Sequence, residues 1–307
     1  MPLRRTDLAV FLLFALGLAW LVALPLWFGD GIASPLLQPL GAVMMFTPTL
    51  GVLAAWRVTR TPRAEFAART GLGLGPAKSR TFGLIAAAWL LTPVFVVVSL
   101  ALSSALGLLT LDLSGLSLYR TVMRTVAGGG ADGLDPHTAW AAQLVSGLTF
   151  GTLITVLPAF GEEWGWRGWL LPRLTETLGV PRALLLSGVI WGLWHAPLTL
   201  LGYNYPGLGA WAAALFTGFC VVYGLVIGWL RLRSGSVWPA VVAHAALNAT
   251  AGTFLMLGDA AAPPDPVVAG PLGLVGWALL AALGVALLRF LPVRRPADAP
   301  DRPVPAA

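Results

Sequence analysis

The chain has 307 residues, of which 57% are hydrophobic and only 10% are Asp, Glu, Lys or Arg. Because a soluble domain is about 25% charged, this composition excludes a water-soluble globular protein. The net charge of +6 leaves an anionic partner such as nucleic acid open until the charges are placed along the chain.

Eight stretches of 19 to 28 residues contain no Asp, Glu, Lys or Arg. A bilayer core about 30 Å thick is crossed by about 20 apolar helical residues. Strands would need a closed barrel and shorter, alternating segments. The sequence therefore predicts an all-α polytopic membrane bundle of about eight transmembrane helices. The stretches are 8–28, 36–56, 82–109, 140–160, 183–201, 211–230, 237–257 and 267–288.

The connections between these stretches differ in character along the chain. The first two stretches form a hairpin, and a basic loop over 57–81 leads to the longest stretch, which we expect to tilt in the bilayer. The segment 110–139 contains Gly128-Gly129-Gly130 and is expected to be flexible. The tail from Pro292 is rich in proline and is expected to be disordered.

The basic residues are sorted by side. If the first helix starts in the cytoplasm, the segments on that side hold 17 of the 19 Lys and Arg residues, and the opposite side keeps Arg120 and Arg124. This positive-inside pattern predicts that both termini are cytoplasmic, and we expect a multi-pass protein of the inner cell membrane. The basic charge is then a signal of topology, so no nucleic-acid partner is expected. The single cysteine, Cys220, excludes an intrachain disulfide.

Ionisable groups inside a membrane are costly, so each one is a candidate functional residue. Only two histidines, His195 and His244, lie within the predicted spans. Two adjacent glutamates, Glu162 and Glu163, stand where the fourth span leaves the membrane, and Arg167 follows them. These positions are the candidates for a site.

Helical spacing allows the candidates to converge. His244 and Asn248 are four residues apart and share a helix face, and Glu163 and Arg167 have the same spacing and can pair. Glu162 then points about 100° away from Glu163. At about 1.5 Å per residue, His244 lies about two turns and His195 about three turns from the cytoplasmic end. The sequence predicts a pocket in the cytoplasmic part of the bilayer.

Two kinds of hydrolytic chemistry suit this set. A carboxylate beside an imidazole in an apolar pocket can activate water as a general base, while a second imidazole and a carboxamide stabilise an oxyanion. Alternatively, Glu162, His195 and His244 are a ligand set for catalytic zinc. Both point to amide hydrolysis. The H-E-x-x-H motif of one class of zinc protease is absent from the sequence.

Other roles for these residues remain open. A single membrane histidine can act as a polar contact between helices, and the glutamate pair can be a solvated charge beside Arg167. Trp164, Trp166 and Trp169 are typical of the aromatic belt at a membrane interface. Gly165 and Gly168 can serve only to permit close helix contact, and the two tryptophans near His195, Trp191 and Trp194, can pack or line a pocket.

In combination, the three motifs resemble the CPBP family of CAAX-protease and bacteriocin-processing intramembrane proteases, also called the Abi family. The family pattern is E-E-x-x-x-R, then F-x-x-x-H, then H-x-x-x-N or H-x-x-x-D. Here the motifs run from Glu162 to Arg167, from Trp191 to His195 and from His244 to Asn248, with Trp191 in the position of the family's Phe. The family's architecture has eight spans.

The resemblance implies an intramembrane endopeptidase in which Glu162 and His195 activate water and His244 and Asn248 form the oxyanion site. Glu163, Arg167 and Trp191 would support them. The family is described both as metalloproteases and as glutamate-dependent proteases, so a zinc ion on Glu162, His195 and His244 stays open as a cofactor. Eukaryotic relatives cleave the C-terminal tripeptide from prenylated CAAX proteins.

The resemblance covers about residues 140–257. It implies one membrane domain with three parts: N-terminal helices and loops over 1–139, a catalytic core over 140–257, and a last helix with a disordered tail over 258–307. The partners expected are the lipid bilayer and a peptide or protein substrate reached from the membrane or cytoplasmic side. Two rival hypotheses are a non-catalytic immunity or scaffold protein and a proton-coupled transporter.

Overall fold

The computed structural model describes residues 5–127 and 135–293. Within these residues the fold is helical, and extended pairing is limited to isolated bridges such as that between Leu111 and Gly258. The predicted all-α membrane bundle is therefore confirmed. The helices are α1 Arg5–Trp27, α2 Leu37–Met44, α3 Thr47–Thr59, α4 Arg63–Thr70, α5 Lys78–Ala105, α6 Ser117–Ala127, α7 Pro136–Ser146, α8 Thr152–Glu163, α9 Leu171–Leu178, α10 Val180–Trp194, α11 Ala196–Thr199, α12 Ala210–Ser234, α13 Trp238–Leu255 and α14 Leu274–Phe290.

Each of the eight charge-free stretches contains a helix, but the helices differ in length. Among the described residues, five helical stretches are long and apolar enough to cross a membrane, and two shorter helices, α10 and α14, are also apolar. The predicted number of about eight spans therefore stays a prediction. The five long stretches are Arg5–Trp27, Leu37–Thr59, Lys78–Ala105, Pro136–Leu178 and Ala210–Ser234.

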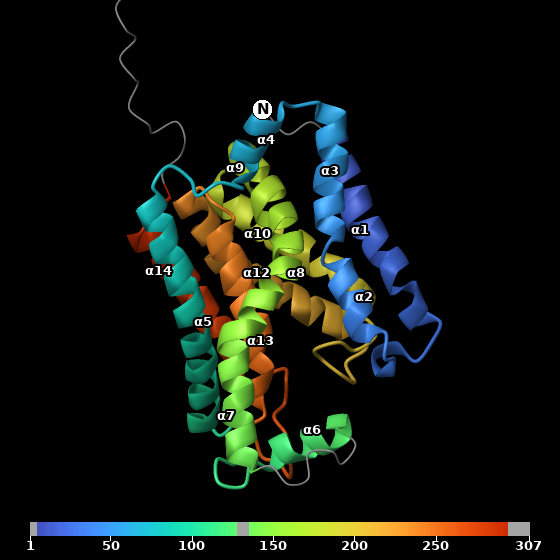
Figure 1. The fold of residues 1–307 in the computed structure, drawn as a ribbon, viewed down its shortest axis with the longest axis vertical. Helices are drawn as coiled ribbons and strands as arrows, with labels where there is room; N and C mark the ends of the chain where they lie inside the picture. The colour runs from blue at the N-terminus through green and yellow to red at the C-terminus, as the bar shows by residue number, and fades with distance from the viewer. Residues whose placement is uncertain (1–4, 128–134, 294–307) are drawn as a thin grey trace, which may run out of the picture.

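The bundle is built around α12, which packs against α10, α13 and α14, while α1 lies along α3 at one side (Figure 1). Small residues permit the close contact of α10 with α12: a Cβ atom on Gly188 would lie 2.7 Å from the Cα atom of Val221. Close backbone approach at small residues is the usual way in which membrane helices pack. The contact matters for the site because His195 directly follows α10.

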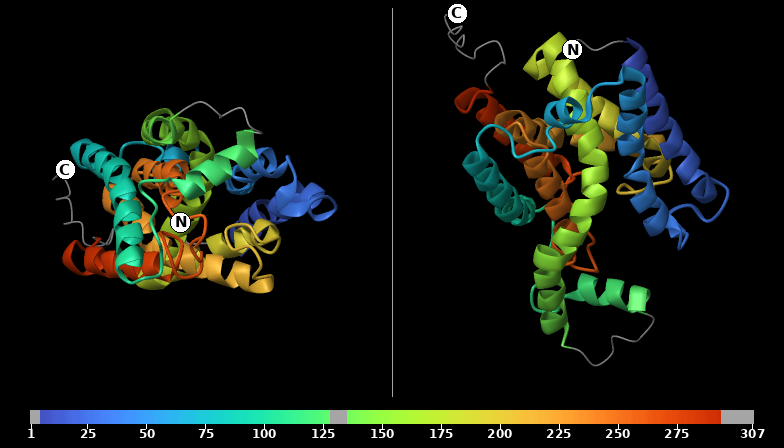
Figure 2. Two further views of the ribbon diagram at one scale, coloured as in Figure 1. Left: turned by 90° about the horizontal axis from the view of Figure 1, so that it is seen from below. Right: turned by 45° about the horizontal axis from the view of Figure 1, so that its top comes forward.

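The segments that hold most of the basic residues gather at one end of the bundle. Arg231 Nη2 donates to the carbonyl of Arg69 at 3.2 Å, and the indole of Trp229 donates to the carbonyl of Leu291 at 2.9 Å. Figure 1 and the right view of Figure 2 place α4 and α9 at this end and α6 across the other. The sorting of charge along the sequence thus corresponds to two ends of the molecule.

The segment between α5 and α7 has more structure than expected. It contains α6, which carries Arg120 and Arg124, and a turn closed by Asp112, whose carboxylate accepts from the backbone N–H groups of Gly115 and Ser117. The hydroxyl and backbone of Ser117, with the Gly115 N–H, lower the pKa of Asp112. The expected flexibility at Gly128-Gly129-Gly130 and the expected disorder beyond residue 293 lie outside the described residues.

Replacing Gly188 with alanine tests the contact of α10 with α12. We expect Gly188→Ala to lower the unfolding free energy by about 1–3 kcal/mol, because overpacking a tight contact forces a backbone shift, and to lower the melting temperature in detergent. The control is Gly83→Ala on α5, where an added Cβ meets nothing within 4 Å. Equal melting temperatures for the two variants would contradict the close packing.

Candidate functional site

The glutamate pair ends α8, at a point where the backbone changes its winding. Residues Trp164–Leu170 form a π-helical turn between α8 and α9, a feature that often occurs at functional sites. Gly165 lets this turn lie against α3, where any side chain would collide with Pro48. Glu162 and Glu163 are thereby buried, at 2% and 0% exposure, rather than solvated at a helix end.

The sequence predicts that the tryptophans of the π-helical turn belong to an interfacial aromatic belt, but two of the three lie in the protein core. Trp166 and Trp169 are fully buried, and both contact Phe11 of α1, with ring centroids 5.5 and 4.5 Å apart. Trp164 is half-buried and stacks on Phe160 at 5.6 Å. The prediction was wrong for Trp166 and Trp169 because packing between helices places their indoles in the protein core.

Glu163 accepts two hydrogen bonds in the protein interior. Its Oε1 atom lies 3.0 Å from Arg167 Nη1 and 2.9 Å from His244 Nδ1. The predicted pairing of Glu163 with Arg167 is present, and the bond to His244 connects the first motif to the third. Since a carboxylate oxygen only accepts, His244 Nδ1 carries a proton, and Nε2 is the nitrogen left for other partners.

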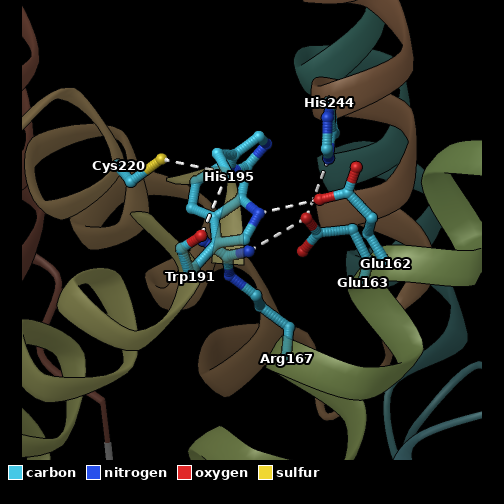
Figure 3. A network of polar contacts seen from close by, with 7 residues as sticks. All are labelled: Glu162, Glu163, Arg167, Trp191, His195, Cys220 and His244. Carbon is cyan, nitrogen blue, oxygen red and sulfur yellow. Dashed lines mark hydrogen bonds and ion pairs between the residues drawn. The ribbon is translucent and has the colours of Figure 1, made fainter. Parts of the chain in front are cut away.

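Glu162 turns away from Glu163, as its position in the helix predicts. Its Oε2 atom accepts a hydrogen bond from the indole Nε1 of Trp191 at 2.7 Å (Figure 3). Trp191 is 2% exposed, and its ring lies over the guanidinium of Arg167, with Cζ 4.0 Å from the ring centroid. The adjacent carboxylates therefore have different hydrogen-bond partners: Trp191 for Glu162, and Arg167 with His244 for Glu163.

His195 lies directly after α10, where its ring is fixed by the backbone of the same helix. Its Nδ1 atom is 2.9 Å from the carbonyl oxygen of Trp191. A carbonyl only accepts, so Nδ1 carries the proton and Nε2 of the neutral ring has a free lone pair. The rings of Trp194 and Phe216 enclose the imidazole at centroid distances of 4.5 and 4.6 Å.

A single cavity of about 520 Å³ collects the predicted catalytic residues from three motifs. Glu162, His195, His244 and Asn248 all line it. The first three are buried, whereas Asn248 is exposed. Trp191 also lines the cavity, while Glu163 and Arg167 are not among its lining residues and support it from behind.

Most of the remaining cavity wall is apolar, and much of it comes from helices α2 and α12, which carry none of the three motifs. Met44 and Met45 contribute from the end of α2, Phe216 and Phe219 from α12, and Leu247 from α13. A pocket with a largely apolar lining and a few convergent polar groups is typical of a binding or active site. The wall therefore suits an apolar group next to the polar set.

Sequence reasoning missed five polar residues of the cavity, including Gln38 and Thr155. Tyr203 and Asn204 line it from the loop between α11 and α12, and Tyr223 lines it from α12. The hydroxyl of Tyr223 is buried without a hydrogen-bond partner. Tyr223 could have been identified as a polar residue within a charge-free span. Nothing in the sequence of the loop between α11 and α12 indicates that this loop lines the cavity. Cys220, which the sequence analysis considered only for a disulfide, is buried beside the site with Sγ 4.0 Å from His195 Nδ1.

The arrangement of the donor side chains bears on the zinc hypothesis, which stays a prediction. Among the described residues, no group of three His, Cys, Asp or Glu side chains is close enough to hold a metal ion. Glu162, His195 and His244 share a cavity but do not converge as a ligand set. In this arrangement the three side chains therefore do not fit a three-ligand zinc site.

Removing Arg167 should destabilise the protein strongly. In Arg167→Met, the carboxylate of Glu163 stays buried without its cation, which typically costs about 3–5 kcal/mol. The matched control is Arg69→Met, since Arg69 pairs with Glu65 at the same spacing but in solvent, where such a pair contributes at most about 0.5 kcal/mol. Thermal unfolding in detergent measures both, and similar losses would contradict a special role for the buried pair.

Two comparisons with known proteins match the same region of the chain. Residues 137–250 match the model of the family described as type II CAAX prenyl endopeptidase Rce1-like. A curated relative, CAAX prenyl protease 2 of Methanococcus maripaludis, is 28% identical over 117 residues, which cover 34% of this chain and 43% of the relative. The chain thus spans less than half the length of that relative. The matched region carries all three motifs, so this part of the chain is similar to the CAAX-protease-like membrane proteins of the CPBP family.

Proposed function

We propose that the chain is a CAAX-type intramembrane endopeptidase that hydrolyses a peptide bond in the cavity. The observation that carries the proposal is that a carboxylate, two imidazoles and a carboxamide line one cavity of an apolar helical bundle. The family match supports the same activity. Polar groups inside an apolar bundle cost free energy unless they are paired. Their gathering around one cavity is therefore better explained by function than by stability.

In the proposed mechanism, Glu162 and His195 prepare the nucleophile. The Glu162 carboxylate takes a proton from a water molecule while the lone pair on His195 Nε2 accepts the water's other hydrogen. The oxygen attacks the carbonyl carbon of the scissile bond, and the carbonyl oxygen becomes an oxyanion. Glu162 then returns the proton to the leaving nitrogen as the C–N bond breaks, so one group serves as base and then as acid.

The oxyanion is stabilised by Asn248 and His244. The Asn248 carboxamide donates directly from its NH₂ group. His244 can donate from Nε2 only as an imidazolium, because Nδ1 already carries the proton directed at Glu163. Two carboxylates and one guanidinium, from Glu162, Glu163 and Arg167, leave the buried cluster with a charge of −1. An imidazolium at His244 brings this charge to zero, which favours the donating form.

The proposed substrate is a peptide or protein segment that reaches the cavity from the bilayer or the cytoplasmic side. The apolar wall formed by Phe216, Phe219 and Leu247 favours a segment that carries an apolar group near the scissile bond. The proposed location is the inner cell membrane, with the basic end of the bundle in the cytoplasm.

Activity in proteoliposomes tests the catalytic assignment. With a fluorogenic lipidated peptide as probe, we expect Glu162→Gln and His195→Asn to lower kcat/KM by about 10²–10⁴-fold, the usual contribution of a general base. The controls are Glu65→Gln and His137→Asn, whose side chains are exposed and outside the cavity. Turnover by Glu162→Gln at the wild-type rate would overturn the proposal and favour a non-catalytic polar network.

Metal dependence is tested separately on the purified protein. We expect elemental analysis to find no stoichiometric transition metal and turnover to persist in a strong chelator, because Glu162, His195 and His244 do not form a converging ligand set. A loss of activity that added zinc restores would show that these side chains rearrange around a metal ion.

A further inference from the structure

Trp191 contacts four polar residues of the site, namely Glu162, Arg167, His195 and His244. Its indole N–H donates to Glu162 at 2.7 Å, and its backbone carbonyl accepts from His195 at 2.9 Å. Its ring centroid lies 5.6 Å from the rings of both His195 and His244, and its face covers the guanidinium of Arg167 (Figure 3). One buried residue therefore connects the three motifs.

The indole bond makes the two oxygens of Glu162 different. Oε2 accepts the N–H of Trp191, whereas no other donor among the described residues bonds to the Glu162 side chain. Because Glu162 lines the cavity, its Oε1 atom is the oxygen left to accept a proton from a cavity water. A carboxylate with one oxygen fixed also has a defined orientation, which general-base catalysis requires.

The direction of the indole is itself fixed by packing. Arg167 lies against one face of the ring at 4.0 Å, and the ring of Tyr223 lies 6.2 Å away. Immediately after Trp191, Gly192 brings α10 so close to Thr217 of α12 that a Cβ atom would collide with it. The N–H group is therefore held in position by its neighbours on α12 and in the π-helical turn.

We propose that Trp191 is a positioning residue whose N–H group holds Glu162 Oε2 and leaves Oε1 as the atom that takes the proton from the attacking water. This inference rests on the proposed function. The bond requires the indole, because the Phe of the family motif has no N–H group to donate. Trp in place of Phe thus adds a hydrogen bond that holds the general base Glu162, and a Phe at this position could not form it.

Trp191→Phe removes the N–H group and keeps an aromatic ring. In proteoliposomes with the fluorogenic lipidated peptide, we expect kcat to fall by about 10- to 100-fold, as for loss of a hydrogen bond to a charged group, while KM changes less than about twofold. The matched control is Trp89→Phe, because the Trp89 indole donates to the carbonyl of Leu148 at the same 2.7 Å distance outside the site. That variant should keep the wild-type kcat.

A second substitution separates the N–H group from the shape of the ring. Benzothienylalanine, incorporated at position 191 by codon suppression, has the size of tryptophan with sulfur in place of N–H, so we expect it to reproduce the kcat loss of Trp191→Phe. Wild-type kcat in this variant would overturn the inference. Glu162→Gln is measured in parallel: if it alone is inactive, only the positioning role fails, and if it is fully active, the proposed function fails.

Discussion

The arrangement depends on one constraint, which is the burial of two adjacent carboxylates inside an apolar bundle. Glu162 and Glu163 cannot share one partner, because consecutive helical side chains diverge by about 100°. Each therefore has its own donors: Glu163 has Arg167 and His244, and Glu162 has Trp191. These bonds join α8, α10 and α13. Because the two buried carboxylates need these partners, they constrain how the three helices pack together.

Much of this arrangement follows from local rules of sequence. Charge-free length predicts the helices, because a helix is the structure that satisfies its own backbone in lipid. The four-residue spacing predicts the pairing of Glu163 with Arg167 and the shared face of His244 and Asn248, and the structure has both the pair and the shared cavity. These features depend on helix geometry alone, which is why they can be read without knowledge of the tertiary structure.

The rest depends on long-range packing that the sequence does not encode locally. No sequence motif predicts the π-helical turn at Trp164–Leu170. Its backbone can pack against α3 because Gly165, which has no side chain, lies against Pro48. The bond from Trp191 to Glu162 joins residues 29 positions apart. The indoles of Trp166 and Trp169 match the composition of an interfacial belt, and only their contacts with Phe11 show that they are core residues.

The two hydrogen bonds of Trp191 differ in how much they depend on the side chain at position 191. The one to His195 uses the main-chain carbonyl and survives any side chain that keeps α10 helical, whereas the one to Glu162 uses the indole. Evolution can therefore exchange the aromatic residue at this position without losing the histidine's orientation. A Phe side chain at position 191 would thus leave the orientation of His195 intact and remove only the bond that holds Glu162.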